Sequence, residues 1–460
     1  MKIISYCNTF LIQLRLKVKF NWRLILIFLS LFSFATSLAR NFSKGNKPIL
    51  NADSAFFQHA GWYINQGAIP YIQIWDIKPP MTYYTTTALA RLSIDNMYNV
   101  HIYNVILTII SGILIVLFVG ELINQITNDN IASVIGGISV LTFAGFHYLA
   151  SQGFRPKYLS IAFGLLGIIL QYRDRPFQSG LTSALSAGYV QHAAIFAIIT
   201  LGIAAQNSEK STIYKTFIGM LIMTLLVILP IYWFNANSQM ITQVILVPFA
   251  ASEPMSMLET IRRVGKLLLY TGYSMVIFII GAYAIMKTSI SNLSENWWVI
   301  LGLLMYIIIL LIADFDNYPD IFFLLIFVSI GVGLYVAHAE KSKKSIVIAL
   351  VTIIAIFSVI SMGGVGLVTN GSVYTQSLDQ SLNSSDTLIH NGVKTIEAQF
   401  NAESLRRNSI TEKPSIIRNR ISMTDLFWKK ETPVSCHYRL SEAELIWIEH
   451  SNSTYTKKTC

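Results

Sequence analysis

The stretch Asn51–Pro80 places acidic, basic and imidazole side chains among aromatic residues, between two long apolar runs. These side chains are Asp53, His59, Asp76 and Lys78. Two prolines follow Lys78, and they fix the backbone so that the next helix cannot start earlier. Lys78 is therefore expected at the membrane surface, where an ammonium group can neutralise a phosphate or diphosphate. A lysine that snorkels to the interface is the alternative that the same spacing leaves open.

Asp53 opens an amphipathic segment within this stretch. The apolar residues of the segment are Ala55, Phe56, Phe57, Ala60 and Tyr63. Such a segment is expected to lie flat on a bilayer. On spacing alone, Asp53 can serve as the N-cap of that helix, because its carboxylate can accept a hydrogen bond from the first turn. A role in chemistry is compatible with this structural role.

A second group of charges lies in "SQGFRPKYL", where Arg155 and Lys157 precede another apolar run. A guanidinium group can bind a phosphate through two parallel hydrogen bonds. Arg155 and Lys157 are therefore interpreted as ligands of an anionic head group. An arginine that only snorkels to lipid head groups is the open alternative.

The loop "DFDNYPDIFF", residues 314–323, combines acidic, amide and aromatic side chains between two late apolar runs. Carboxylates and amides can hold pairs of neighbouring sugar hydroxyls, and a tyrosine offers a face for stacking. The residues expected to bind sugar are Asp316, Asn317, Tyr318 and Asp320. A solvated loop whose negative charge keeps it outside the membrane is the alternative.

The composition indicates the elements that must position these groups. The chain has 460 residues, of which 53% are hydrophobic and only 13% charged, and its mean hydropathy is +0.53. This is about half the charged fraction of a soluble domain, so the sequence predicts a polytopic, all-α membrane protein. The net charge of +10 is scattered over loop ends, which is typical of basic cytoplasmic loops and excludes a dedicated nucleic-acid-binding domain.

The apolar runs predict the membrane topology. An anchor at 22–39 follows a basic N-terminus, and further runs lie near 99–122, 131–150, 157–172, 213–233, 265–286, 297–313, 320–338 and 345–368. If 178–207 forms two half-length spans and 81–93 lies at the interface, the chain crosses about eleven times. This count places the arginine and lysine clusters at 173–175, 210–215 and 341–344 inside the cell. A competing count makes 81–93 a span and 178–207 a single one, and it differs only between about 93 and 180.

The predicted organisation has three parts. Residues 1–21 are a cytoplasmic N-terminus, and residues 22–368 are a transmembrane domain with a first outer loop at 40–80. Residues 369–460 are polar and are expected to form a small extracytoplasmic domain, which holds glycan-acceptor triplets at Asn370, Asn383 and Asn452. The cysteines Cys7, Cys436 and Cys460 form no metal-binding spacing, and whether Cys436 and Cys460 pair is left open.

The order of these features resembles a known family. One spanning helix, an outer loop with an early acid, Gly67, Tyr71 and then "WDIKPPMTYY" before further helices is similar to the GT-C superfamily of integral membrane glycosyltransferases. The branch it resembles contains lipid A aminoarabinose transferases and protein O-mannosyltransferases. The likeness covers most of the first 235 residues and, more loosely, the rest.

The resemblance implies roles for individual residues. Asp53 falls where the family has its catalytic base or acceptor-orienting acid, and Lys78 falls where a lysine binds the phosphate of a polyprenyl-phosphate sugar. Both are needed, because the acceptor must be oriented or deprotonated and the departing phosphate must be stabilised. Substrate contacts are further expected from His59, Tyr71, Asp76, Tyr83, Gln191 and His192.

Two departures from the family pattern change these expectations. Arg155 and Lys157 stand where many members carry a second acid, and Gln191-His192 replaces a lysine of the next outer hairpin. One carboxylate among cations is a poor site for a divalent cation, so no metal ligand or certain cofactor is assigned.

The sequence therefore predicts a glycosyltransferase of the cytoplasmic membrane with an active site that faces outside. It would move a sugar from a polyprenyl- or dolichyl-phosphate donor to a glycan, lipid or protein acceptor. A transporter or flippase of lipid-linked saccharides is the alternative, because many spans with nearby cations suit an anionic cargo. No inverted repeat supports that alternative, and a scaffold protein would need neither Asp53 nor Lys78.

Overall fold

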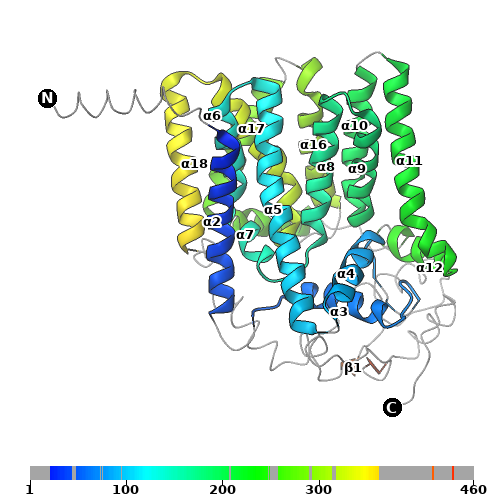
Figure 1. Cartoon of the computed structure of the whole chain (residues 1–460). Helices are drawn as coiled ribbons and strands as arrows, with labels where there is room; N and C mark the ends of the chain where they lie inside the picture. The colour runs from blue at the N-terminus through cyan, green and yellow to red at the C-terminus, as the bar shows by residue number, and fades with distance from the viewer. Residues whose placement is uncertain are drawn as a thin grey trace.

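The computed structural model is a helical bundle with one pair of two-residue antiparallel strands (Figure 1). It describes residues 21–43, 48–72, 74, 76–94, 96–206, 209–246, 248, 257–289, 293–312, 318–361, 417–418 and 438–439. The elements are α2 (Trp22–Phe42), α3 (Ala52–Asn65), α4 (Met81–Leu92), α5 (Met97–Thr127), α6 (Asn130–Leu141), α7 (Ala144–Ala150), α8 (Pro156–Tyr172), α9 (Pro176–Tyr189), η1 (Gln191–Ala193), α10 (Ala194–Gln206), α11 (Lys210–Trp233), α12 (Asn237–Ile241), η2 (Thr242–Leu246), α14 (Met257–Thr271), η3 (Gly272–Ser274), α15 (Met275–Ala284), η4 (Ile285–Ser289), α16 (Leu293–Ile312), η5 (Tyr318–Ile321), α17 (Phe322–His338), α18 (Lys341–Ser361), β1 (Ile417–Arg418) and β2 (Tyr438–Arg439). The three cysteines and the three glycan-acceptor triplets lie outside the described residues.

Six helices in the described part are long and apolar enough to cross a membrane, or seven if the bent pair α6 and α7 counts as one span. The predicted break of 178–207 is present, because α9 ends at Tyr189 and α10 begins at Ala194 after a short 3-10 turn. Four further helices lie alongside the long helices (Figure 1), namely α8, α9, α10 and α16. They are shorter or less apolar than a membrane-spanning helix. The total of about eleven crossings therefore stays a prediction.

The helix α17 forms the centre of the bundle. Of the 18 residues that form its most apolar stretch, 78% are buried. The corresponding values are 22% for α11 and 28% for α18, which have lipid-facing surfaces. α17 approaches α15 closely at Gly331, where an added Cβ atom would lie 2.3 Å from the carbonyl oxygen of Gly281. Small residues allow membrane helices to pack this closely, so these glycines set the contact between the two helices.

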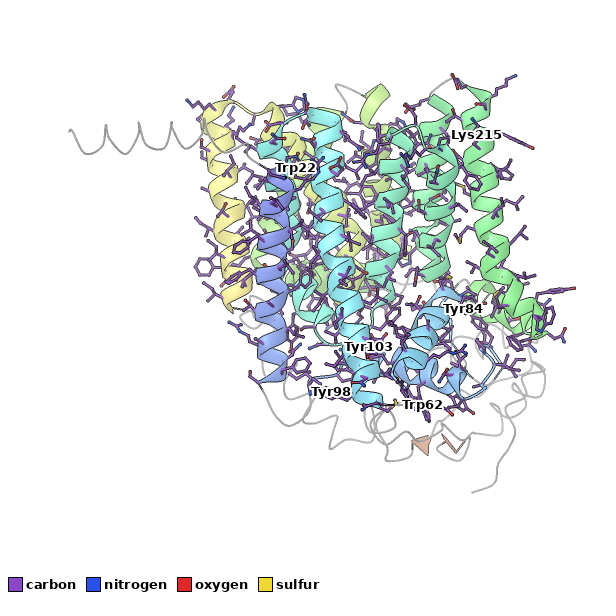
Figure 2. The ribbon with its side chains drawn as sticks, viewed as in Figure 1. Trp22, Trp62, Tyr84, Tyr98, Tyr103 and Lys215 are labelled. Carbon is purple, nitrogen blue, oxygen red and sulfur yellow. The ribbon has the colours of Figure 1, made fainter. Side chains whose placement is uncertain are left out.

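One end of the bundle is held by ion pairs between basic and acidic residues. Glu121, near the end of α5, accepts hydrogen bonds from Arg23 at 2.8 Å and from Arg173 at 2.5 Å. Lys344 at the start of α18 pairs with Asp129 at 2.8 Å. Figure 2 shows Trp22 and Lys215 toward this end, and Trp62 and Tyr98 at the opposite end. The clusters predicted to be cytoplasmic thus gather at one end of the molecule.

The apolar run 131–150, expected as one segment, is bent by 66° between α6 and α7. The carbonyl of Thr142, at the end of α6, accepts a hydrogen bond of 2.6 Å from the hydroxyl of Ser274. A helix break leaves backbone carbonyls without helical partners, and Ser274 satisfies one of them. This contact between distant segments is the physical reason why the bend was not visible in the local pattern.

A buried histidine links the first described helix to the last described one. Nδ1 of His147 on α7 lies 2.7 Å from the hydroxyl of Ser37 on α2, and its Nε2 lies 2.9 Å from the hydroxyl of Ser358 on α18. Arg40 also donates a hydrogen bond of 2.7 Å to the carbonyl of Ile360. α2, α7 and α18 are therefore joined through polar side chains as well as through apolar packing.

The helices α3 and α4 lie together at the end opposite the ion pairs (Figure 1). The expectation that the apolar face of α3 lies on a bilayer is wrong. Phe57 is 4% exposed and its ring lies 6.2 Å from that of Phe154, so this face packs against the protein. The N-cap of α3 is Asn51, whose Oδ1 accepts from the backbone N–H of Asp53 at 3.0 Å. Asp53 is in the first turn and is not the cap.

Candidate active site

An ion pair joins the start of α3 to the loop before α8. Nη1 of Arg155 lies 2.7 Å from Oδ2 of Asp53. The Arg155 side chain is 7% exposed and that of Asp53 is 39% exposed, so the carboxylate is the part of the pair that a second molecule can reach. Nε of Arg155 makes no hydrogen bond within the described part of the chain, and a guanidinium has five N–H donors. Arg155 therefore retains donors for an anion.

The local sequence explains the place of Arg155. Gly153 has φ +118°, a conformation that side chains rarely adopt, and an added Cβ atom would lie 2.3 Å from Nε2 of Gln58 on α3. A glycine at this position therefore lets the loop lie against α3. Arg155 itself is extended, with φ −137° and ψ 109°, as a residue before a proline must be. Pro156 then starts α8.

A second ion pair lies at the start of α8. Lys157 donates a hydrogen bond to Asp320 on η5, the short turn before α17. Both side chains are largely buried, at 12% and 8% exposed. A buried pair of this kind is stable only if the charges compensate each other. The acidic partner of Lys157 thus comes from Asp320, 163 residues further along the chain.

The loop that carries Lys78 connects α3 and α4. α4 begins at Met81, directly after Pro80, as the two prolines predict. The hydroxyl of Tyr71 donates a hydrogen bond of 2.7 Å to the carbonyl of Lys78. Tyr71 is fully buried and has φ +66°, which is strained for a residue with a side chain. The strained residue thus holds the backbone of Lys78.

The carboxylate of Asp76 organises the same loop from within. Its Oδ1 accepts from the backbone N–H of Ile77 at 2.8 Å, and its Oδ2 accepts from the hydroxyl of Tyr83 on α4 at 2.5 Å. Burial raises the pKa of Asp76, while the charge of Lys78 and the hydrogen bond from Tyr83 oppose this rise. The rings of Tyr71 and Tyr83 meet edge to face at 5.8 Å, so Asp76 lies in an aromatic enclosure.

Two glutamines attach the loop to the rest of the bundle. Nε2 of Gln191 donates to the carbonyl of Ile77 and, at 3.1 Å, to the carbonyl of Val244. Gln243 on η2 donates a hydrogen bond of 2.8 Å to the carbonyl of Tyr71 and accepts one of 3.2 Å from the N–H of Asp76. Gln243 did not enter the sequence-based site, because it is a neutral residue in an apolar region. Nothing in the local sequence signals that its amide makes these two contacts.

The two histidines of the predicted site lie in different surroundings. The His192 ring lies 4.5 Å from that of Phe323 and 5.9 Å from that of Tyr306, whose hydroxyl donates to the carbonyl of His192 at 3.2 Å. His59 is buried on α3, with its ring 5.4 Å from that of Trp62. His192 is therefore part of the boundary between η1 and α17, whereas His59 belongs to the packing of α3.

The basic groups of the predicted site share one electrostatic neighbourhood. The charge of Lys157 interacts with those of Lys78 and Arg155 as well as with Asp320, and His192 interacts with Lys157 and Lys78. Segments far apart in the sequence thus bring their charges to one end of the bundle. Asp316 and Asn317 lie outside the described residues, as does the side chain of Tyr318.

Among the described residues, no group of three or more His, Cys, Asp and Glu side chains could hold a metal ion. The cations of the site, together with the two acids that pair with them, are suited to an anion that approaches from this end. Such a site can hold an anionic group close to the partly exposed carboxylate of Asp53.

Comparisons with solved structures show a related fold. ArnT from Cupriavidus metallidurans bound to undecaprenyl phosphate matches with a TM-score of 0.58 at 10% sequence identity, covering 94% of this chain and 88% of that one. ArnT from the same organism in the apo state matches with a TM-score of 0.56 at 10% identity, covering 90% of this chain and 85% of that one. At this identity the likeness concerns the fold alone.

Comparisons of sequence are more specific. The profile of a family described as DolP-mannose mannosyltransferase matches residues 67–229, which include the Lys78 loop and both Arg155 and Lys157. The dolichol phosphate-mannose mannosyltransferase of Haloferax volcanii is 32% identical over 441 residues, covering 94% of each chain. The chain therefore belongs to the dolichol phosphate-mannose mannosyltransferase family of membrane glycosyltransferases.

Proposed function

We propose that the protein transfers a mannosyl group from dolichyl phosphate mannose, or a closely related polyprenyl-phosphate sugar, to an acceptor hydroxyl or amide. Family membership and the match along nearly the whole length of the Haloferax volcanii enzyme support this donor. The observation that carries the proposal is the ion pair of Asp53 and Arg155, 2.7 Å apart, together with the electrostatic interaction of Lys157 with both Arg155 and Lys78.

The cations would bind the phosphate of the donor. Arg155 keeps donors beyond its bond to Asp53, and Lys78 lies on a loop whose backbone is fixed by several hydrogen bonds. The bond between the anomeric carbon and the phosphate oxygen breaks during transfer, and the electron pair leaves with the phosphate. Positive charge already in place stabilises that phosphate without rearrangement.

Asp53 would act on the acceptor. Its carboxylate is accessible and can take the proton of the acceptor as the new bond to the anomeric carbon forms. The bond to Arg155 holds the carboxylate in one orientation and keeps it next to the phosphate site. Tyr71 and Asp76 of the loop would support Lys78 together with Tyr83 on α4. The hydroxyl of Tyr71 bonds to the carbonyl of Lys78, and that of Tyr83 bonds to Asp76.

The basic end of the bundle supports an orientation in the membrane. Arg23, Arg173 and Lys344 lie in ion pairs at the end opposite α3, and basic residues favour the cytoplasmic side. The proposed site would then face outside, in the cell membrane. The acceptor would be a glycan, lipid or protein, and residues 369–460 would form an extracytoplasmic domain on the same side.

The proposal is tested with purified full-length protein, dolichyl phosphate mannose and membrane-derived acceptors. We expect mannosyl transfer by the wild type, and a loss of turnover in Asp53→Asn with unchanged binding of dolichyl phosphate. Asn124→Asp is a matched control, because Asn124 lies on α5 near the opposite end of the bundle and bonds to Asn130. Normal turnover in Asp53→Asn would remove the assignment of the base.

A further inference from the structure

The clearest unassigned feature near the site is the double hydrogen bond made by Gln243. Its side-chain amide contacts the loop between α3 and α4 at two points that are five residues apart, the carbonyl of Tyr71 at 2.8 Å and the N–H of Asp76 at 3.2 Å. Gln243 is 2% exposed. One buried amide thus uses both its donor and its acceptor on the segment that leads to Lys78.

The Gln243 amide adds to the hydrogen bonds that the loop makes within itself. Within the loop, Tyr71 N–H bonds to the carbonyl of Ile74 at 2.9 Å, and the side chain of Tyr71 reaches the carbonyl of Lys78 at 2.7 Å. Because Tyr71 has a strained φ of +66°, its conformation must be held by contacts. Gln243 supplies such a contact at the carbonyl of the strained residue itself.

The amide also connects the loop to an element with exposed apolar residues. Gln243 lies on the π-helical turn η2, whose residues Ile245 and Leu246 are 47% and 45% exposed. Gln191 ties Val244 of the same turn to the carbonyl of Ile77. The loop is thus linked to η2 at Tyr71 through Gln243 and at Ile77 through Gln191. A shift of η2 would therefore move the backbone that carries Lys78.

We infer that Gln243 is a positioning residue for the donor phosphate, acting through the backbone of the Lys78 loop. This inference rests on the proposed role of Lys78 in phosphate binding. Without the amide, the carbonyl of Tyr71 and the N–H of Asp76 lose their partner, and the loop is free to relax. Lys78 would then be held less firmly, and the entropy lost on fixing it would reduce donor affinity.

The test is a double-mutant cycle on the full-length protein. Gln243→Met removes the amide at nearly constant volume, and Lys78→Ala removes the ammonium. Binding of dolichyl phosphate is measured for the wild type, both single variants and the double variant. We expect Gln243→Met to weaken binding by about tenfold, the scale of two lost hydrogen bonds, while kcat for mannosyl transfer falls less than about threefold. In the Lys78→Ala background, Gln243→Met should have no further effect.

Gln239→Met is the matched control. Gln239 lies on α12, four residues earlier, and its Oε1 makes no hydrogen bond within the described part of the chain, so donor binding should remain normal. If Gln243→Met does not accumulate in membranes, Gln243→Leu, which is also uncharged and also lacks the amide, provides the same test.

Each other outcome has a defined meaning. Effects of Gln243→Met and Lys78→Ala that simply add would show that Gln243 acts elsewhere, and would overturn this inference while leaving the proposed function intact. Normal dolichyl phosphate binding by Lys78→Ala would overturn the phosphate role of Lys78 and this inference together. A loss of kcat without a change in binding would also contradict a positioning role.

Discussion

Nη1 of Arg155 and Oδ2 of Asp53 lie 2.7 Å apart, so the proposed phosphate ligand and the proposed base are separated by a single hydrogen bond. The two functions thereby share one geometry. A phosphate that binds Arg155 lies next to the carboxylate that must meet the acceptor. The ion pair holds these two side chains in a fixed orientation relative to each other before a substrate binds.

Replacing Arg155 tests this shared geometry. We expect Arg155→Ala to lower both donor affinity and turnover, because a charge-assisted contact worth about 1.5 to 3 kcal/mol is lost and Asp53 loses its orienting partner. Arg155→Lys should restore part of the affinity, since a lysine keeps the charge but not the planar group. Dolichyl phosphate binding and mannosyl transfer are measured separately. Unchanged values in Arg155→Ala would leave only the snorkelling role.

The phosphate role of Lys78 leads to a graded expectation. Lys78→Ala should reduce donor affinity and rate by roughly tenfold to a hundredfold, the scale of one charge-assisted contact. Lys78→Arg should recover part of this loss, limited by its larger head group. Lys78→Gln, which keeps length but not charge, is the matched control and should behave as Lys78→Ala. Full transfer activity in all three variants would exclude Lys78 from the site.

The buried pair of Lys157 and Asp320 should show a strong dependence on both partners. Asp320→Asn or Lys157→Met alone leaves an uncompensated buried charge and should cost roughly 3 to 5 kcal/mol of unfolding free energy. The double variant should recover most of that stability. Thermal unfolding in detergent gives the comparison. A double variant that is stable but inactive would assign the pair of Lys157 and Asp320 a role in substrate binding, and one less stable than either single variant would contradict a simple pair.

Membrane orientation can be read from fusions at two positions that flank α8. A reporter that is active only outside the cytoplasm should be active when fused after Gly153 and silent when fused after Asp174. The reason is that Arg173 lies in the basic end of the bundle with Arg23 and Glu121, whereas Gly153 lies against α3. The reverse pattern would place the proposed site on the cytoplasmic side.

Asp76 should make stability depend on pH. Burial raises its pKa in the folded protein above the unfolded value of about 3.9. The folded state therefore binds more protons than the unfolded state between these two values, and the unfolding free energy should fall as pH rises through this window. Asp76→Asn, which keeps one oxygen to accept from the N–H of Ile77 and does not titrate, should flatten the curve. Thermal unfolding at a series of pH values checks this, and an unchanged slope would count against it.

Much of the helical scaffold could be predicted from the sequence. Long apolar runs bounded by charged or polar residues located α2, α11 and α17 to within three residues, because a spanning helix needs an apolar length set by the bilayer. The same reasoning missed the bend between α6 and α7. At that bend the carbonyl of Thr142 bonds to Ser274, 132 residues away, a contact that the local pattern does not show.

The candidate site was predictable in its residue types and less so in its pairings. Asp53, Lys78 and Arg155 were selected because charge is rare beside apolar helices. The partner of Lys157 could not be foreseen, since Asp320 lies 163 residues further along the chain. Gln243 was missed for a related reason, because a neutral amide in an apolar segment gives no local sign that it binds two backbone groups at a distance.

The chain of Ser37, His147 and Ser358 has a consequence for biogenesis. Helices enter the membrane in the order of synthesis, so His147 reaches the bilayer with Ser37 available and with Ser358 still to be made, 211 residues later. Until then Nε2 of His147 lacks this partner, and a polar group in lipid without a partner is costly. The insertion of α18 supplies the missing partner of His147. Ser358→Ala would therefore affect the handling of the new protein by membrane quality control and not the chemistry of the site.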